Sequence, residues 1–305
     1  MKRAEREVEL FDALDFDFDE LDSDLNLIEI EELQEFQSPL VTAALQGDLG
    51  EVNKLLAEGV SADEKDGFGS TALIAAASHG HVAVVETLAQ RVSNLSDVDT
   101  FGNSALIAAA SRGHHETVQV LIDAGAVARN LSDGFFAMLQ AVSVESSEKL
   151  EGCMLSAQLL INAGVNPNDT DEKGTRAVQV ACKRGNVPML DMLISNGAQV
   201  DLLDKKGRGL LTYAVAQNSL PMVQSLVDQG LDLNQRINAK KNQTILMYAT
   251  NKGFAEIAGF LKVQGADQEI LDYKGRNASD YAGVTKVSAT ALDQENKKAR
   301  VGEGK

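Results

Sequence analysis

The chain has 305 residues, of which 44% are apolar and only 5% aromatic, and its formal net charge is −17. This negative field argues against nucleic acid as a direct ligand, because it repels phosphates, and no apolar run approaches the ~20 residues that cross a bilayer. The two cysteines, Cys153 and Cys182, are too few for a disulfide framework, and we interpret them as small buried apolar residues. We expect a cytoplasmic protein without a secretory signal, since the basic start turns acidic at once, and with a core of small aliphatic side chains that suits packed helices.

Residues 1–35 form an acidic segment in front of the rest of the chain. Residues 1–36 hold 14 Asp and Glu against three Lys and Arg, a net charge of 3 − 14 = −11, which leaves −6 for the remainder. Its apolar residues recur at helical spacing and would form one stripe along a helix: Phe11, Leu14, Phe18, Leu21, Leu25 and Ile28. Because Asp forms helices poorly and the carboxylates repel one another, we expect this amphipathic arm to need a partner surface.

Three surfaces remain open for the acidic arm. It could cap the exposed end of the fold that follows, lie on a basic face of the same chain, or bind a different protein. We favour the cap, because a terminal structural unit otherwise exposes the face on which units stack.

Behind the arm the sequence repeats itself. The stretch "TALIAAASHGH" at residues 71–81 recurs as "SALIAAASRGH" at residues 104–114, 33 residues later. The glycine that closes each unit recurs at intervals of 66 (two units of 33), 39, 33, 33 and 35, with Val92 at the skipped position: Gly59, Gly125, Gly164, Gly197, Gly230 and Gly265. Such a period predicts a solenoid of stacked units, because one unit alone cannot bury its apolar face.

Each unit predicts a helix, a tight turn and a second helix. A hydroxyl that can accept a backbone N–H bond precedes the first helix at Thr71, Ser104 and Thr244. Apolar residues at helical spacing, such as Val118 and Leu121, predict the second helix. The residue that ends the first helix is expected to have a positive φ, which Gly and Asn tolerate: Gly80, Gly113, Gly185, Asn218 and Gly253.

The units resemble ankyrin repeats, whose pattern runs roughly Asp-x-x-Gly-x-Thr-Pro-Leu-His-x-Ala-Ala-x-x-Gly-His-x-x-Val-Val-x-x-Leu-Leu-x-x-Gly-Ala. The second unit matches this order at Asp66, Gly69, Thr71, Leu73, Ala76, Ala77, Gly80, His81, Val84, Val85 and Leu88. The second and third units depart from the pattern where Ala72 and Ala105 replace Pro and where Ile74 and Ile107 replace His. The resemblance covers about residues 36–282 and implies an all-α ankyrin-repeat solenoid of about seven helix-turn-helix repeats plus a terminal half repeat, with finger turns. Residues 283–305 are expected to be a disordered tail.

The residues that could carry chemistry fit structural roles better. All four histidines, His79, His81, His114 and His115, fall in two successive turns and suggest a metal site, but His81 and His114 fill the family's Gly-His position, where the imidazole serves the turn. The stretch "DFDFDE" at residues 15–20 resembles a calcium loop, but Glu20 stands where its turn glycine belongs. No Ser-His-Asp arrangement, phosphate-binding glycine loop or pair of catalytic carboxylates is present in suitable surroundings. We expect no enzyme, no metal and no cofactor.

The resemblance implies that binding residues lie at the finger turns and at the ends of the first helices. It assigns Phe68, Phe101 and Phe135 to the fingers of the second to fourth repeats. Exposed aromatic side chains at neighbouring fingers would be binding anchors, or the three rings could pack on one another along the row. Arg112 completes this first group of candidates.

The later fingers carry cations. Between residues 171 and 241, ten Lys and Arg stand against seven Asp and Glu, a net charge of 10 − 7 = +3 in an otherwise negative chain. The resemblance places six of them at the fingers of the fifth to seventh units and two at the end of a first helix: Lys173, Lys205, Lys206, Arg208, Lys240 and Lys241, then Lys183 and Arg184. A basic face for an acidic ligand and a merely solvated face are both compatible with this pattern.

Two units contain inserted residues. The fourth has about six extra residues near "SVESSEKLEG", between its helices, and the seventh has two in "QRINAKKNQ", which should lengthen a basic finger. Insertions in solenoids map to loops and often mark a contact surface, so we expect loops at both places.

Together these features predict a non-enzymatic protein–protein interaction module. The leading interpretation is a cytoplasmic adaptor or inhibitor that covers a partner protein with its fingers and first helices. The negative charge also permits an immunity- or antitoxin-type inhibitor of a basic or nucleic-acid-processing protein, while a structural scaffold is disfavoured by the segregated finger chemistry. We expect a monomer that binds neither nucleic acid nor membrane, and whose arm could shield the basic face until a partner displaces it.

Overall fold

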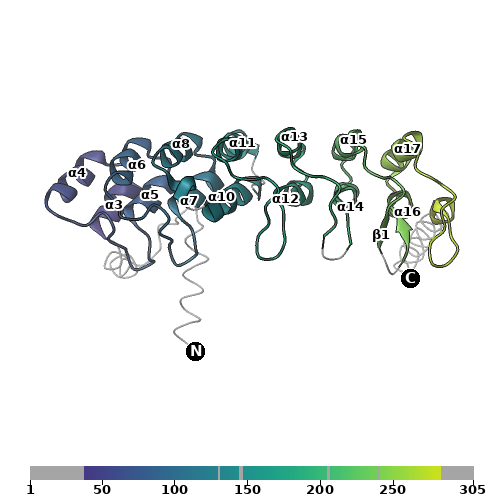
Figure 1. The fold of residues 1–305 in the computed structure, drawn as a ribbon, viewed down its shortest axis with the longest axis horizontal. Helices are drawn as coiled ribbons and strands as arrows, with labels where there is room; N and C mark the ends of the chain where they lie inside the picture. The colour runs from purple at the N-terminus through teal and green to yellow at the C-terminus, as the bar shows by residue number, and fades with distance from the viewer. Residues whose placement is uncertain (1–37, 130, 144–146, 205–206, 239–240, 283–305) are drawn as a thin grey trace, which may run out of the picture.

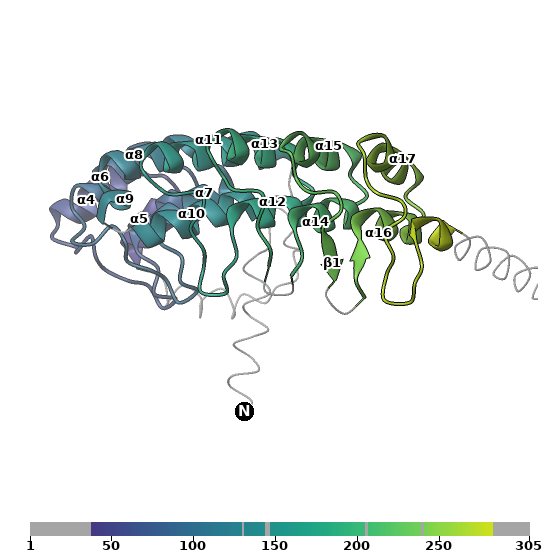
Figure 2. The same cartoon turned by 45° about the vertical axis from the view of Figure 1, so that its right-hand side comes forward.

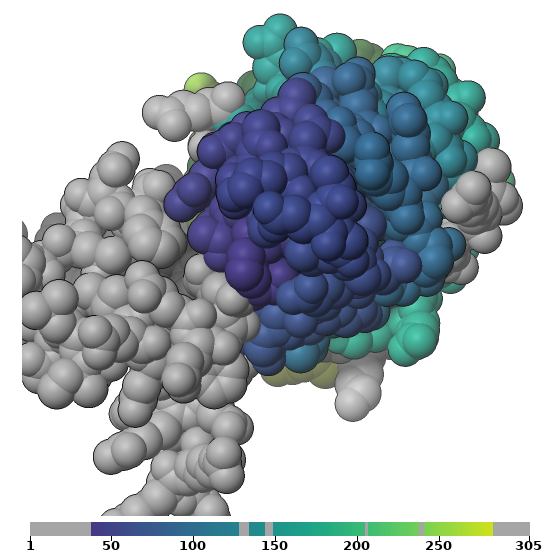
Figure 3. Space-filling model, turned by 90° about the vertical axis from the view of Figure 1, so that its left-hand side faces the viewer, coloured from purple at the N-terminus to yellow at the C-terminus, as the bar shows by residue number. Residues whose placement is uncertain are grey.

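The structure is a row of paired helices. The computed structural model describes residues 38–129, 131–143, 147–204, 207–238 and 241–282, so the predicted arm and tail lie outside the described residues. Figure 1 shows two parallel rows, in which the first helix of each pair lies below the second. Seen from the N-terminal end, the first unit, in purple, lies in front of the units stacked behind it (Figure 3). This arrangement confirms the predicted all-α solenoid.

The two rows have regular members. The first helices are α3 (Pro39–Leu45), α5 (Ala72–Ser78), α7 (Ala105–Arg112), α10 (Leu131–Ser143), α12 (Ala177–Arg184), α14 (Leu210–Ala216) and α16 (Ile245–Lys252). The second helices are α4 (Leu49–Ala57), α6 (Val82–Ala89), α8 (His115–Asp123), α11 (Ser147–Asn162), α13 (Val187–Ser195), α15 (Leu220–Asp228) and α17 (Ala255–Val263). A short helix, α9 (Ala126–Arg129), precedes α10, and a last helical turn covers residues 278–282.

Local sequence signals define where the first helices begin and end. Thr71 Oγ1 accepts a hydrogen bond from the Ile74 N–H (3.3 Å), and Ser104 Oγ accepts one from the Ile107 N–H (3.2 Å). These bonds satisfy backbone donors that the first helical turn leaves unpaired. The predicted positive φ is present at all five turn residues: Gly80 (72°), Gly113 (78°), Gly185 (72°), Asn218 (51°) and Gly253 (78°).

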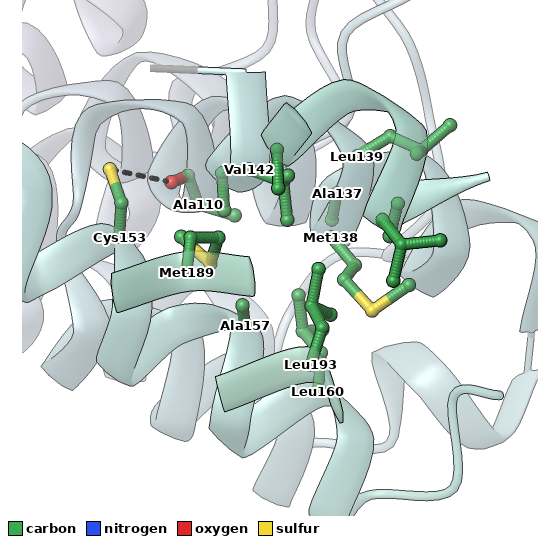
Figure 4. Close-up of a cluster of buried hydrophobic side chains, with 14 of the residues drawn as sticks. Ala110, Ala137, Met138, Leu139, Val142, Cys153, Ala157, Leu160, Met189 and Leu193 are labelled. Atoms are coloured by element: carbon green, nitrogen blue, oxygen red, sulfur yellow. Dashed lines mark hydrogen bonds between the residues drawn. The ribbon is translucent and has the colours of Figure 1, made fainter. Parts of the chain in front are cut away.

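The core runs along the whole row, between the two layers of helices. Residues 72–77 of α5 and 105–110 of α7 are all buried, and most of them are alanines, which let neighbouring first helices approach closely. Larger side chains from both layers fill the space between them, such as Met138 of α10, Leu160 of α11 and Leu193 of α13 (Figure 4). Cys153 and Cys182 are free and buried, and burial raises the pKa of their thiols to about 11 and about 12, as expected of apolar core residues.

Finger turns extend from the first-helix row, away from the second helices (Figure 2). The seventh finger contains a short antiparallel hairpin, β1 (Arg236–Asn238) and β2 (Gln243–Thr244), whose register is irregular between Arg236 and Asn238. The two residues predicted to be inserted in this unit fall in that finger. The hairpin itself is an element that the helical pattern did not predict.

The fourth unit has no finger. Where the other units turn, the chain forms α9 and the first half of α10, and Phe135 is buried in α10 with 4% of its surface exposed. The prediction that Phe135 lies on a finger is therefore wrong. The second and third fingers each contain an aspartate, and the residue three positions after it, Gly69 or Gly102, has a positive φ. The corresponding residue of the fourth unit is Phe136. A bulky side chain disfavours that turn, and the apolar spacing favours a helix instead.

The insertion of the fourth unit lengthens its helices. α10 has 13 residues and α11 has 16, whereas α7 has 8 and α8 has 9. The expected loop is thus mostly helix, since "SEKLEG" belongs to α11. The longer α11 lies directly on the turn between α7 and α8 of the third unit. A Cβ at Gly152 would collide there with the carbonyl oxygen of Gly113.

In the part of the chain that the structure describes, every helix is too short or too polar to cross a membrane.

Candidate functional site

Every finger turn except the seventh, where Ala239 stands in its place, has one aspartate that holds the turn and presents a tip residue. Asp66 Oδ1 accepts hydrogen bonds from the N–H groups of Phe68 and Ser70, both at 2.9 Å. Asp272 Oδ1 does the same for Lys274 (2.8 Å) and Arg276 (2.9 Å). We call the residue two positions after the aspartate, or after Ala239 in the seventh finger, the fingertip. Because the aspartate bonds to the fingertip backbone, the turn does not prescribe which side chain stands there.

The fingertip position changes character along the row. It is Phe68 and Phe101 in the second and third units, and lysine in each unit after the fingerless fourth one: Lys173, Lys206, Lys241 and Lys274. Lys206 lies outside the described residues, as do the predicted finger residues Lys205 and Lys240. Lys274 was not among the predicted finger residues, although the stretch "DYKGR" at residues 272–276 parallels "DKKGR" at residues 204–208.

The aromatic half of the row is partly open to solvent. Phe101 has 59% of its surface exposed, and Phe68 is half-buried. The two fingers are joined by a hydrogen bond from the Thr100 N–H to the Phe68 carbonyl (3.1 Å). Beyond them, Phe136 on α10 is 39% exposed, although the sequence analysis had chosen its neighbour Phe135. An exposed aromatic side chain on a fixed turn is a suitable anchor for a protein contact.

The cationic half contains exposed and paired groups. Lys173 and Lys241 are exposed on fingers, and Lys183 and Arg184 are exposed in the last turn of α12, where the helix dipole favours positive charge. These positions agree with the sequence-based assignment. Arg112 also ends a first helix, but its Nη1 donates to the Ser78 carbonyl oxygen (2.9 Å), which ties α7 to α5.

Arg208 belongs to a partly buried network that the sequence did not predict. Its Nε donates to Asp204 Oδ2 (2.7 Å), and Tyr213 donates its hydroxyl to the same oxygen (2.6 Å). The ring of Tyr213 lies between two cations, with Lys183 Nζ 5.4 Å and Arg208 Cζ 5.0 Å from its centre. Burial, followed by the hydrogen bond to Asp204, raises the pKa of Tyr213 to about 12.

The same network recurs 68 residues later as Asp272, Arg276 and Tyr281. Tyr281 donates to Asp272 Oδ2 (2.7 Å), and Arg276 donates to it from Nη2 (2.8 Å) and Nε (3.0 Å). Burial opposes ionisation of Asp272, but these donors and two backbone N–H groups hold its pKa well below the usual range. A repeated pattern, Asp-x-Lys-Gly-Arg followed by Tyr five residues after the Arg, would have revealed both networks.

The histidines join successive units. His81 Nε2 donates to the Leu45 carbonyl oxygen (2.9 Å), and His114 Nε2 donates to the Ser78 carbonyl oxygen (3.1 Å). Each imidazole lies against the turn glycine of the preceding unit, and burial lowers the pKa of His114. These contacts support the structural interpretation of both residues. Within the described ranges, no three His, Cys, Asp or Glu side chains form a group that could hold a metal ion.

Comparison with known proteins gives a consistent result. A family-wide sequence pattern described as "Ankyrin repeats (3 copies)" matches residues 40–131 and 149–237. The crystal structure of the human ASB11 ankyrin repeat domain is 25% identical, covers 76% of this chain and 99% of its own, and has a TM-score of 0.62. A chain from the complex of the predatory endopeptidase Bd0816 of Bdellovibrio bacteriovorus with the immunity protein Bd3460 is also 25% identical, covers 63% of this chain and 98% of its own, and has a TM-score of 0.53. No curated protein sequence matches the chain.

Proposed function

The chain belongs to the ankyrin-repeat family, whose repeats are protein–protein interaction modules, and we propose that it is a cytoplasmic adaptor or inhibitor that binds a partner protein with its fingertips and first-helix ends. Binding, with no catalytic step of its own, is the activity that this arrangement serves. The partner is covered over several units at once, so that contacts from separate fingers add up.

The observation that carries this proposal is the change of fingertip chemistry on a constant turn. The aspartate and the positive-φ residue recur, whereas the fingertip is Phe101 on one side of the fingerless unit and Lys173 on the other. A scaffold that only separates other parts has no use for such segregation. These fingertips fit a partner that has an apolar patch next to an acidic patch. The aromatic fingertips would contact the apolar patch and the lysines would face the acidic patch.

An immunity-type inhibitor is the second candidate. It is supported by the similarity to a chain from the complex of Bd0816 with the immunity protein Bd3460. The acidic arm, with its net charge of −11, would then face a basic enzyme. Affinity that collapses between about 50 and 500 mM salt favours this charge-led binding, whereas salt-insensitive affinity favours the aromatic fingertips.

Site-specific photocrosslinking tests the proposal. A benzophenone amino acid is placed at Phe101 on the third finger and, as a control, at Val263 on α17, which is 84% exposed. In the cells to which the chain is native, we expect a defined protein adduct at the fingertip that the control lacks. Equal adducts at both positions, or adducts at Val263 alone, would contradict binding through the fingertips.

A further inference from the structure

The first helices of the C-terminal units share a tyrosine. Tyr213 in α14, Tyr248 in α16 and Tyr281 in the last helical turn each occupy the fourth position of their helix, where α5 and α7 have alanine. A cation accompanies each of these rings: Lys183 Nζ lies 5.4 Å from the centre of Tyr213, Lys252 Nζ lies 5.7 Å from that of Tyr248, and Arg276 Cζ lies 4.5 Å from that of Tyr281. We call Lys183, Tyr213, Tyr248 and Lys252 the cation–tyrosine row.

The segment around this row is net positive, with ten Lys and Arg against seven Asp and Glu between residues 171 and 241. Among these acids, Asp204 is paired with Arg208. Asp191 and Asp228 belong to the second helices α13 and α15. The fingertip lysines Lys173 and Lys241 add to the positive charge of the same units. An acidic segment with apolar side chains therefore fits this surface.

We infer that the cation–tyrosine row is the docking surface for residues 1–35 of the same chain. That segment holds 14 Asp and Glu, and its apolar residues follow a helical stripe that includes Phe11 and Phe18. Its carboxylates would pair with the lysines while its apolar stripe covers the half-buried ring of Tyr248; Tyr213 itself is buried and lies next to Lys183. The docked segment would cover the cationic half of the site and leave the aromatic fingertips open.

Charge favours the row over the cap that the sequence analysis preferred. The first unit is itself acidic, with Asp48 at the start of α4 and Glu51 and Glu58 following. Its Lys54 is already paired with Glu51, at 2.9 Å. Fourteen further carboxylates at this end would be repelled, whereas the cation–tyrosine row attracts them.

The arm is long enough to reach the row. First helices packed side by side lie ~8–10 Å apart, so α12 is ~40 Å and α16 ~60 Å from α3. The 37 residues that precede Ser38 span ~120 Å when extended, and still ~60 Å from Ser38 to Phe11 when residues 11–28 form the helix of the apolar stripe and residues 29–37 are extended. Tethering also gives an effective concentration of the order of mM, at which several ion pairs, each worth ~0–1 kcal/mol, suffice for docking.

Carbodiimide crosslinking of the full chain tests the inference, because this reagent joins a carboxylate to a lysine amine that it contacts. We expect peptides in which Asp or Glu of residues 1–35 is linked to Lys183, Lys252, Lys173 or Lys241, and we expect these links to fade at 500 mM salt. Crosslinks to Lys54 instead would show a cap. Either that result or the absence of any link from the arm to the row would overturn the inference.

Two controls complete the experiment. In a Lys183→Glu/Lys252→Glu variant, the links to the remaining Lys173 and Lys241 should fall at least tenfold. A Lys54→Glu/Lys262→Glu variant, changed on the second helices α4 and α17, should keep them.

In a mixture of ¹⁵N-labelled and unlabelled chains, links within one chain carry a single isotope, so a large share of mixed pairs would assign the surface to a second copy and contradict the inference. No partner protein is needed, so the result is independent of the proposed function.

Discussion

At the scale of single residues, the fingers separate what holds the turn from what faces solvent. Asp99 accepts the N–H groups of Phe101 (2.9 Å) and Asn103 (2.8 Å), and the positive φ of Gly102 closes the turn. The side chain of the fingertip takes no part in these bonds. It can therefore change from Phe to Lys between units while the turn stays the same.

The buried hydroxyl of Tyr213 should stabilise the sixth finger. Tyr213→Phe removes the donor to Asp204 and the acceptor for Arg208, so we expect the free energy of unfolding to fall by about 1–3 kcal/mol, as for a hydrogen bond to a charged group. Urea denaturation followed by circular dichroism measures this loss.

Tyr248 offers a matched control for that substitution. It has the same helix position as Tyr213, but Ala239 and Gln243 stand where the sixth unit has Asp204 and Arg208. Tyr248→Phe should therefore change the free energy of unfolding by less than about 0.5 kcal/mol. Equal losses for the two variants would show that the Asp–Arg–Tyr network contributes nothing.

The sequence predicted local turns better than it predicted networks. The helix caps at Thr71 and Ser104 and the positive φ of Asn218 followed from residue types whose chemistry acts within a few positions. The pairing of Arg208 did not, because it depends on Tyr213, which the family pattern does not contain at that place. Arg208 was thus counted as a surface cation although its guanidinium is bound to Asp204.

At the scale of elements, the fourth unit shows where the repeat pattern fails. The resemblance assigned Phe135 to a finger, but Phe136 occupies the position that needs a positive φ, and the apolar residues around it follow helical spacing. Helix propensity likewise made the inserted residues part of α11. A period identifies units, whereas the conformation of an insertion depends on its own residues.

The contact between α11 and the preceding turn gives a prediction at this scale. Gly152→Ala places a Cβ against the carbonyl oxygen of Gly113, so the backbones must separate, and we expect the unfolding free energy to fall by ~1–3 kcal/mol. Gly259→Ala in α17 is the control, since a Cβ there meets no atom within 4 Å. It should stabilise the protein by ~1 kcal/mol through helix propensity. Thermal unfolding measures both variants. Midpoint temperatures that shift in the same direction would contradict the proposed contact.

At the scale of the whole molecule, the apolar core is continuous, whereas the charge is segregated along the chain. The core continues through all units, because each pair of helices buries its apolar face on its neighbours. Charge does not follow the repeat: residues 1–36 carry −11, residues 171–241 carry +3, and the aromatic fingertips lie between these two segments in the sequence. The fold was predictable because the period recurs many times. The repeat predicted which positions lie on the surface, but it does not determine which side chains occupy them.

The most direct test of the account replaces one fingertip with the residue that other fingers carry. In Phe101→Lys the turn keeps Asp99 and Gly102, so the free energy of unfolding should stay within about 0.5 kcal/mol of the original. Affinity for the partner found by photocrosslinking, measured by calorimetry, should fall at least tenfold, a loss of about 1.4 kcal/mol, whereas Val263→Lys on α17 should leave it unchanged. Unchanged affinity in a folded Phe101→Lys protein would contradict the claim that the fingertip row binds the partner.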